Sequence, residues 1–147
     1  METQSRQTGW PAWETAARLS ALAIAYYGLA RLGLLFSPID GLASPVWPPA
    51  GLALAATVLW GWRALPAVFV GAAALEWSVT QSPGVSLALA LGNTGEAALG
   101  AWLVSRIGGA RAFDSLRGVA RFARACAVAP VVAATVGASA MVAFGDT

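Results

Sequence analysis

Three ionisable residues of this sequence interrupt long apolar stretches: Arg31, Glu76 and Glu96. In a membrane helix each charge costs roughly 2.5–3.5 kcal/mol at the centre, so each needs a partner or a purpose. Counted from the outer ends of the spans described below, Arg31 lies roughly 8 Å deep and Glu76 roughly 5 Å deep. These depths match and predict an Arg31–Glu76 ion pair, which could serve either helix packing or ligand binding.

Glu96 lies about twelve residues into its apolar stretch, roughly 18 Å deep and near the midplane. Asn93 stands one turn earlier on the same helix face, and Thr94 adds a hydroxyl. One interpretation is interhelical hydrogen bonding, with the glycines at 92, 95 and 100 allowing close approach. The other is a buried ligand or proton site, because desolvation disfavours the ionised form of an unpaired carboxyl.

Several other chemistries are excluded by composition. The sequence has no histidine, which removes the usual general base and the commonest metal ligand. Its single cysteine, Cys126, excludes a disulfide framework and a Cys-rich zinc site. The nine basic residues are all arginine and are too few for a nucleic-acid binder. We therefore expect no enzyme activity, no cofactor, no metal and no nucleic-acid partner.

The depths given above for Arg31, Glu76 and Glu96 assume that the apolar stretches are helices within a membrane. Of the 147 residues, 58% are hydrophobic and 11% are charged, against roughly 25% charged in a soluble domain. The uncharged stretch 125–145 has 21 residues and would reach roughly 31 Å as a helix, the thickness of a hydrocarbon core. Because backbone groups in lipid must be paired within their own segment, we expect helices.

The predicted fold is an all-α, polytopic transmembrane helical bundle that forms one domain over residues 1–147. Prolines 48, 49 and 66 are expected at helix starts, and Pro130 is expected to kink the last span. The short second and third spans could instead be one broken or re-entrant helix. About five spans are predicted, at Thr15–Ser37, Trp47–Trp62, Ala64–Val79, Gly84–Arg106 and Phe122–Phe144.

Arginine placement predicts the orientation of the spans. Arginines lie on both sides of the start of the first span, in the connection between the second and third spans, and in the connection between the fourth and fifth spans. Residues 37–46 and 79–84, which form the other two connections, contain no arginine. Because cytoplasmic loops are enriched in Lys and Arg, the N-terminus is predicted to be cytoplasmic and the C-terminus external. The seven tryptophans fall near span ends, as expected for an interfacial residue.

The connection 107–124 is the one sizeable cytoplasmic loop. Asp114 is expected to cap a helix that begins near Ser115, with Leu116, Val119 and Phe122 at helical spacing and arginines between them. This segment could rest on anionic headgroups, or it could transmit a signal to a partner, and the two roles are compatible.

An ordered series of motifs resembles a known family. It runs through Trp47-Pro48-Pro49-Ala50-Gly51, Gly61-Trp62-Arg63, Gly92-Asn93-Thr94-Gly95-Glu96, Phe113-Asp114-Ser115-Leu116-Arg117 and Ala129-Pro130. Their order and spacing over about residues 15–144 resemble the type-one membrane-associated sensor family, abbreviated MASE. Gly95 departs from the larger apolar residue that the family tends to carry there.

The resemblance implies a non-catalytic sensory input domain in the bacterial inner membrane. Such domains usually precede cytoplasmic histidine kinases, diguanylate cyclases or cyclic-di-GMP phosphodiesterases, and a homodimer is possible. Family members have about eight spans, so we expect this chain to be a fragment, a degenerate copy or a stand-alone subunit. Together, the residues and the resemblance predict a ligand site formed by Arg31, Trp47, Pro48, Glu76, Asn93, Thr94 and Glu96.

A second hypothesis is a membrane transport component that uses the midplane carboxylate, because charges near the midplane and kinked helices also mark substrate paths. The absence of a visible internal repeat in the sequence argues against this alternative. A third is a purely structural membrane subunit.

Overall fold

The computed structural model describes residues 11–37, 47–108 and 114–144, and every regular element in these ranges is helical. The elements are α1 (Ala12–Leu34), α2 (Pro48–Trp60), the 3-10 turn η1 (Gly61–Ala64), α3 (Leu65–Thr80), α4 (Pro83–Arg106) and α5 (Leu116–Phe144). Each of the five predicted spans corresponds to one of the α-helices. The all-helical fold class is therefore confirmed.

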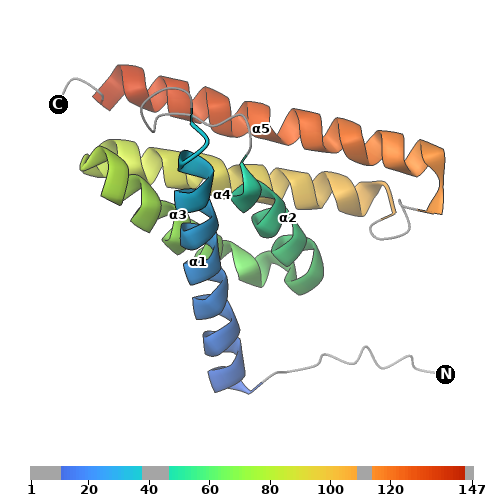
Figure 1. Cartoon of the computed structure of the whole chain (residues 1–147). Coiled ribbons are helices and arrows are strands. Elements are labelled where there is room, and N and C mark those ends of the chain that lie inside the picture. Colours follow the sequence, from blue (N-terminus) through green and yellow to red (C-terminus); the bar gives the residue numbers. More distant parts are fainter. Residues whose placement is uncertain (1–10, 38–46, 109–113, 145–147) are drawn as a thin grey trace.

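Three helical stretches are long and apolar enough to cross a membrane: Pro48–Thr80, Pro83–Arg106 and Leu116–Ala143. The first contains α2, η1 and α3 as one helical run of 33 residues. With 13 and 16 residues, α2 and α3 reach only about 20 and 24 Å, less than the hydrocarbon core of about 30 Å. The chain turns at η1, where Gly61 has a φ of 71° (Figure 1). Whether the chain makes five crossings stays a prediction.

Proline begins the helices where the sequence predicted it. Pro48 and Pro49 occupy the first two positions of α2, and Pro66 stands at the start of α3. The missing proline N–H is harmless there because the first-turn N–H groups have no partner within the helix. Pro130 stands inside α5, and the helix continues through it.

The helices form a layered arrangement in which α4 and α5 lie side by side and α3 packs along α4 (Figure 1). Helix α1 runs across α3, and its first half extends away from α4 and α5 (Figure 1). The crossing is close because Gly71 of α3 faces α1: a Cβ at Gly71 would lie 2.8 Å from the carbonyl oxygen of Ala23. Small residues permit such close backbone approach between membrane helices.

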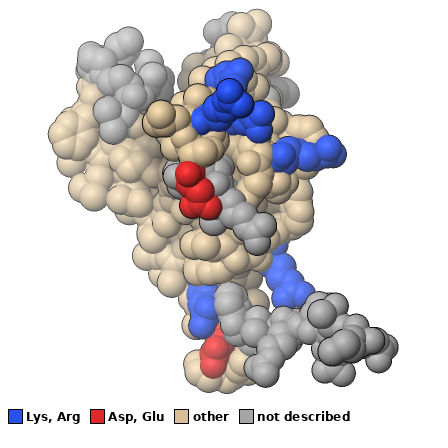
Figure 2. All heavy atoms as spheres, turned by 90° about the vertical axis from the view of Figure 1, so that its right-hand side faces the viewer, with Lys and Arg blue, Asp and Glu red and all other residues tan. Residues whose placement is uncertain are grey.

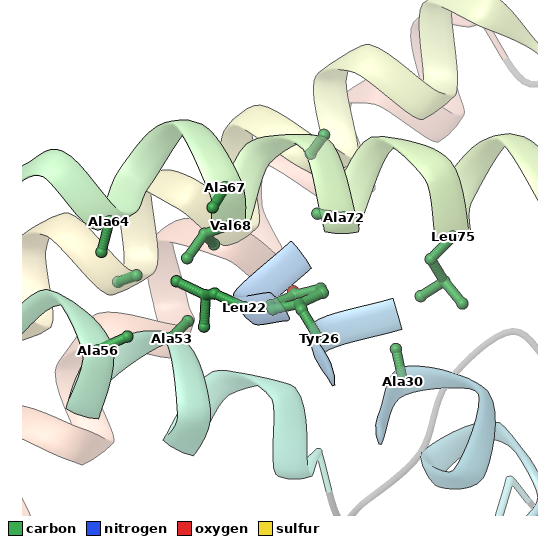
Figure 3. Packing of buried hydrophobic residues seen from close by; sticks show 12 residues of the cluster. Leu22, Tyr26, Ala30, Ala53, Ala56, Ala64, Ala67, Val68, Ala72 and Leu75 are labelled. Carbon is green, nitrogen blue, oxygen red and sulfur yellow. The ribbon is translucent and has the colours of Figure 1, made fainter. Parts of the chain in front are cut away.

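The core lies between α1, α2, α3 and α4 and is built mostly from small side chains (Figure 3). Tyr26, Leu22 and Leu75 are its largest members, and all three are almost completely buried. Bulky apolar side chains point outward instead, and Val142 is 86% exposed. Small residues inside and large apolar residues outside are the pattern expected when lipid surrounds the protein. The alanines of the core are Ala30, Ala53, Ala56, Ala64, Ala67, Ala72, Ala90 and Ala97.

The start of α5 differs in one detail from the prediction. The helix begins at Leu116, close to the expected place, but its cap is Ser115 and not Asp114: the backbone N–H of Gly118 donates to Ser115 Oγ at 3.1 Å. Ser115 directly precedes the first helical residue, Leu116, so it occupies the N-cap position. A side chain at this position accepts a hydrogen bond from the backbone N–H three residues later, which here belongs to Gly118. The predicted basic segment and the predicted last span are thus one continuous helix.

Candidate functional site

A cavity of about 480 Å³ lies between α3, α4 and α5. The end of α1 and the residue before α2 complete its wall. Its size lies within the range of small-molecule sites. The lining residues are Leu34, Trp47, Leu75, Glu76, Val79, Thr80, Leu89, Asn93, Glu96, Ala133, Ala134, Gly137, Ala138 and Met141.

Two neighbouring helices supply the polar side chains of this cavity. Glu76 comes from α3, and Asn93 and Glu96 come from successive turns of α4. Asn93 Nδ2 donates to Glu76 Oε1 across the two helices at 3.5 Å, a long hydrogen bond. The structure thereby brings Glu76 and Glu96 to one cavity, although their positions along the spans predicted different depths for them.

Trp47 connects the cavity to the core. Its side chain is a hydrogen-bond partner of the buried Tyr26, which also lies within electrostatic range of Glu76 and Glu96. Trp47 also packs on α1, since a Cβ at Gly33 would lie 3.3 Å from its ring. Trp47 is therefore half-buried between α1 and α2 and forms part of the cavity wall.

Thr80 closes the end of the cavity where α3 passes to α4. Its hydroxyl lies 2.9 Å from the carbonyl oxygen of Glu76 and 2.9 Å from Ser86 Oγ. The bond to Ser86 joins the last turn of α3 to the first turn of α4. The hydroxyl of Thr80 is thus already occupied by the protein.

Glu96 also lines a second, smaller cavity of about 140 Å³ between α2, α4 and α5. The walls of this cavity include Leu54, Gly100, Cys126 and Pro130. Glu96 is the residue common to the two linings. The carboxyl predicted near the midplane therefore lies between two hollows.

The predicted Arg31–Glu76 ion pair is wrong. In the described part of the chain, Glu76 is bonded to Asn93, whereas Arg31 is exposed and lines an adjoining surface hollow with Ser78 and Val79. Equal depth implies proximity only for helices that run side by side. Because α1 crosses α3 steeply, the matching of depths along the two axes fails (Figure 1).

Two further predicted residues lie outside the cavity lining. The hydroxyl of Thr94 donates to the carbonyl oxygen of Ala90 in its own helix at 2.7 Å. Pro48 is exposed at the first position of α2. Of the predicted set, the cavity gathers Trp47, Glu76, Asn93 and Glu96.

The sequence interpretation missed the wall formed by α5. This wall contains Ala133, Ala134, Gly137, Ala138 and Met141, none of which carries a chemical signature. Its signal was the run of small residues, which predicted only close packing. That packing also occurs, since a Cβ at Gly92 of α4 would lie 3.3 Å from Val136 Cβ.

Arginines gather at the end of the molecule where α4 ends and α5 begins. Figure 2 looks onto this end and shows a group of basic side chains there. They include the exposed Arg106, Arg117, Arg121 and Arg124. Arg106 lies over the ring of Trp102, 4.9 Å from its centroid, as expected for a cation–π contact at a membrane interface.

Within residues 11–37, 47–108 and 114–144, no three His, Cys, Asp or Glu side chains lie close enough to hold a metal ion. The polar groups described above therefore offer hydrogen bonds and charge to a ligand.

Comparison with known proteins gives one match. No curated protein and no solved structure matches this chain significantly. The family model MASE1 matches residues 17–147, nearly the whole sequence, and this family consists of membrane-associated sensory domains. The family resemblance seen in the motifs is thereby confirmed. On this match, together with the apolar helices, the chain belongs to the MASE1 family of membrane-associated sensory domains.

Proposed function

We propose that this chain is a non-catalytic sensory input domain of the bacterial inner membrane. It binds a cue in the cavity between α3, α4 and α5 and passes the change to a cytoplasmic histidine kinase or cyclic-di-GMP module. The observation that carries the proposal is the cavity itself, which joins Glu76, Asn93 and Glu96 to an apolar wall.

A five-span topology with a cytoplasmic N-terminus fits this proposal. In it, the arginine-rich end formed by α4 and α5 faces the cytoplasm, as the enrichment of Arg in cytoplasmic loops requires. The end near Thr80 and Pro83 then lies outside. The cavity lining includes Val79 and Thr80 near that outer end, where a cue from the periplasm or the bilayer would enter.

Helix α5 provides a physical route for the signal. Residues 133–141 line the cavity, and the same unbroken helix begins at Leu116 among the exposed arginines. A ligand that favours one packing of α5 against α4 would therefore move the basic end as well. Such a shift requires that the ligand bind the two packings with different affinity. The basic end, resting on headgroups or on a second copy of the chain, would present the change to the output module.

The test is the thermal unfolding midpoint of the purified protein in lipid nanodiscs, measured against a panel of periplasmic metabolites and membrane lipids. A true cue raises the midpoint, because a ligand that binds the folded state stabilises it. The rise should disappear in Ala138→Leu, which fills the cavity from α5, and persist in Ala127→Leu, an exposed α5 position outside the lining. A panel without any shift would contradict direct sensing.

A second candidate is a transport component, favoured by the position of Glu96 between two cavities. Carboxylates near the midplane are typical of substrate and proton paths. Solute uptake into proteoliposomes that is lost in Glu96→Gln would support transport over sensing.

A further inference from the structure

The cavity between α3, α4 and α5 has a one-sided hydrogen-bonding character. Its lining contains two carboxyl groups and one amide, and no Arg, Lys or His belongs to the described lining. Arg31, the cation predicted to balance Glu76, is outside the cavity lining and lines an adjoining surface hollow that shares Leu34 and Val79 with the cavity. An anionic ligand would therefore meet like charge here without a compensating cation.

Most donors that line the cavity are already engaged within the protein. The Trp47 side chain is bonded to Tyr26, and the Thr80 hydroxyl is within bonding distance of the Glu76 carbonyl oxygen and of Ser86. The Asn93 amide nitrogen donates to Glu76. The groups left for a ligand are the carboxyl oxygens of Glu76 and Glu96 and the carbonyl oxygen of Asn93, which are acceptors, and the second N–H of the Asn93 amide, which is a donor.

The remainder of the wall is apolar. Leu34, Leu75, Leu89 and Met141 enclose the space together with the alanines of α5. Buried carboxylates are costly unless a positive group pairs with them. A volume of about 480 Å³ holds a small organic molecule rather than a bare ion.

We propose that this cavity takes a small organic ammonium ion whose charged head is held by Glu76 and Glu96 and whose apolar body packs against α5. The inference rests on the proposed sensory function, because it names the class of cue for that same site. Asn93 accepts a further N–H of the ammonium group, and the Trp47 ring adds a cation–π contact. The lining, which is rich in acceptors and contains no cation among the described residues, discriminates against anionic and uncharged molecules with the same body.

The test compares three probes with one body and different heads: phenethylamine, 2-phenylethanol and phenylacetate. Binding to the full chain in lipid nanodiscs is measured by calorimetric titration, with empty nanodiscs subtracted. Phenethylamine should bind saturably, and the alcohol and the carboxylate should bind at least about tenfold more weakly, since hydrogen bonds to charged groups are worth this much or more. Equal binding of amine and alcohol, or stronger binding of phenylacetate, would overturn the inference, as would no saturable binding.

Variants locate the site. Glu76→Gln and Glu96→Gln should each weaken phenethylamine binding, while Glu14→Gln, which alters a carboxyl paired with Arg18 on α1, should leave it unchanged. Ala138→Leu narrows the cavity without changing its charge, and it keeps the test valid if a glutamine variant does not fold. Unchanged binding in the glutamine variants that fold and in Ala138→Leu contradicts the assigned site.

The two proposals can fail separately. If phenethylamine binds but leaves the packing of α5 unchanged, the ammonium site stands and the sensory role fails. If phenethylamine does not bind but another metabolite raises the unfolding midpoint in an Ala138-dependent way, the sensory role stands and the ammonium inference fails.

Discussion

The backbone carbonyl oxygen of Ala23 in α1 lies 2.8 Å from the position that a Cβ on Gly71 of α3 would occupy. This contact sets how α1 crosses the bundle. At the same crossing, a Cβ at Gly71 would lie 3.0 Å from Cβ of the buried Tyr26, which is a hydrogen-bond partner of the cavity residue Trp47. Changing Gly71 should therefore affect the core and the site together.

Gly71→Ala is expected to lower the free energy of unfolding by about 1–3 kcal/mol, because an overpacked helix crossing must shift. The measurement is unfolding in mixed micelles followed by circular dichroism. Gly28→Ala is the matched control, because a Cβ at Gly28 would have no other atom within 4 Å. Alanine at this position should stabilise α1 by roughly 0.5–1 kcal/mol. Equal effects of the two substitutions would contradict the close crossing.

Ser115→Ala should destabilise the first turn of α5 by about 0.5–2 kcal/mol, the usual cost of losing an N-cap. The expected sign is faster hydrogen exchange at the amides of Gly118 and Val119. Asp114→Ala serves as the control and should have little effect. A larger effect of Asp114→Ala than of Ser115→Ala on hydrogen exchange would show that Asp114 is the cap.

The proposed topology can be tested with cysteines at the two ends of α4. In a Cys126→Ala background, Pro83→Cys should react with a membrane-impermeant maleimide added to intact spheroplasts, and Ser105→Cys should react only after lysis. Both positions are exposed. Labelling of Ser105→Cys in intact spheroplasts would contradict the proposed topology and show the opposite orientation.

Arginines at the start of α5 should hold that orientation. Replacing Arg117, Arg121 and Arg124 with glutamine is expected to raise the fraction of Ser105→Cys labelled in spheroplasts, because the cytoplasmic bias of charge is weakened. Arg31→Gln removes one charge at the opposite end and should not raise it. No change in the triple variant would show that these arginines do not determine the topology.

Local features of the fold were readable from the sequence. Prolines 48, 49 and 66 marked helix starts, the apolar stretches became helices, and the motif series indicated the family. These features depend on neighbours along the chain, namely the missing proline N–H and the pairing of backbone groups within a helix. The prediction of Asp114 as the cap failed by one residue, because two adjacent residues were both suitable caps.

Tertiary structure alone decided the composition of the site. The sequence identified Glu76, Asn93 and Glu96 as unusual, but only the packing of α3 on α4 placed both carboxyls in one cavity and left Arg31 outside. The α5 wall could not be predicted as part of a site, because alanine and glycine carry no chemistry and act through the space they leave. Depth along a helix follows from residue number, whereas the angle at which two helices cross depends on contacts between distant residues such as Gly71 and Ala23.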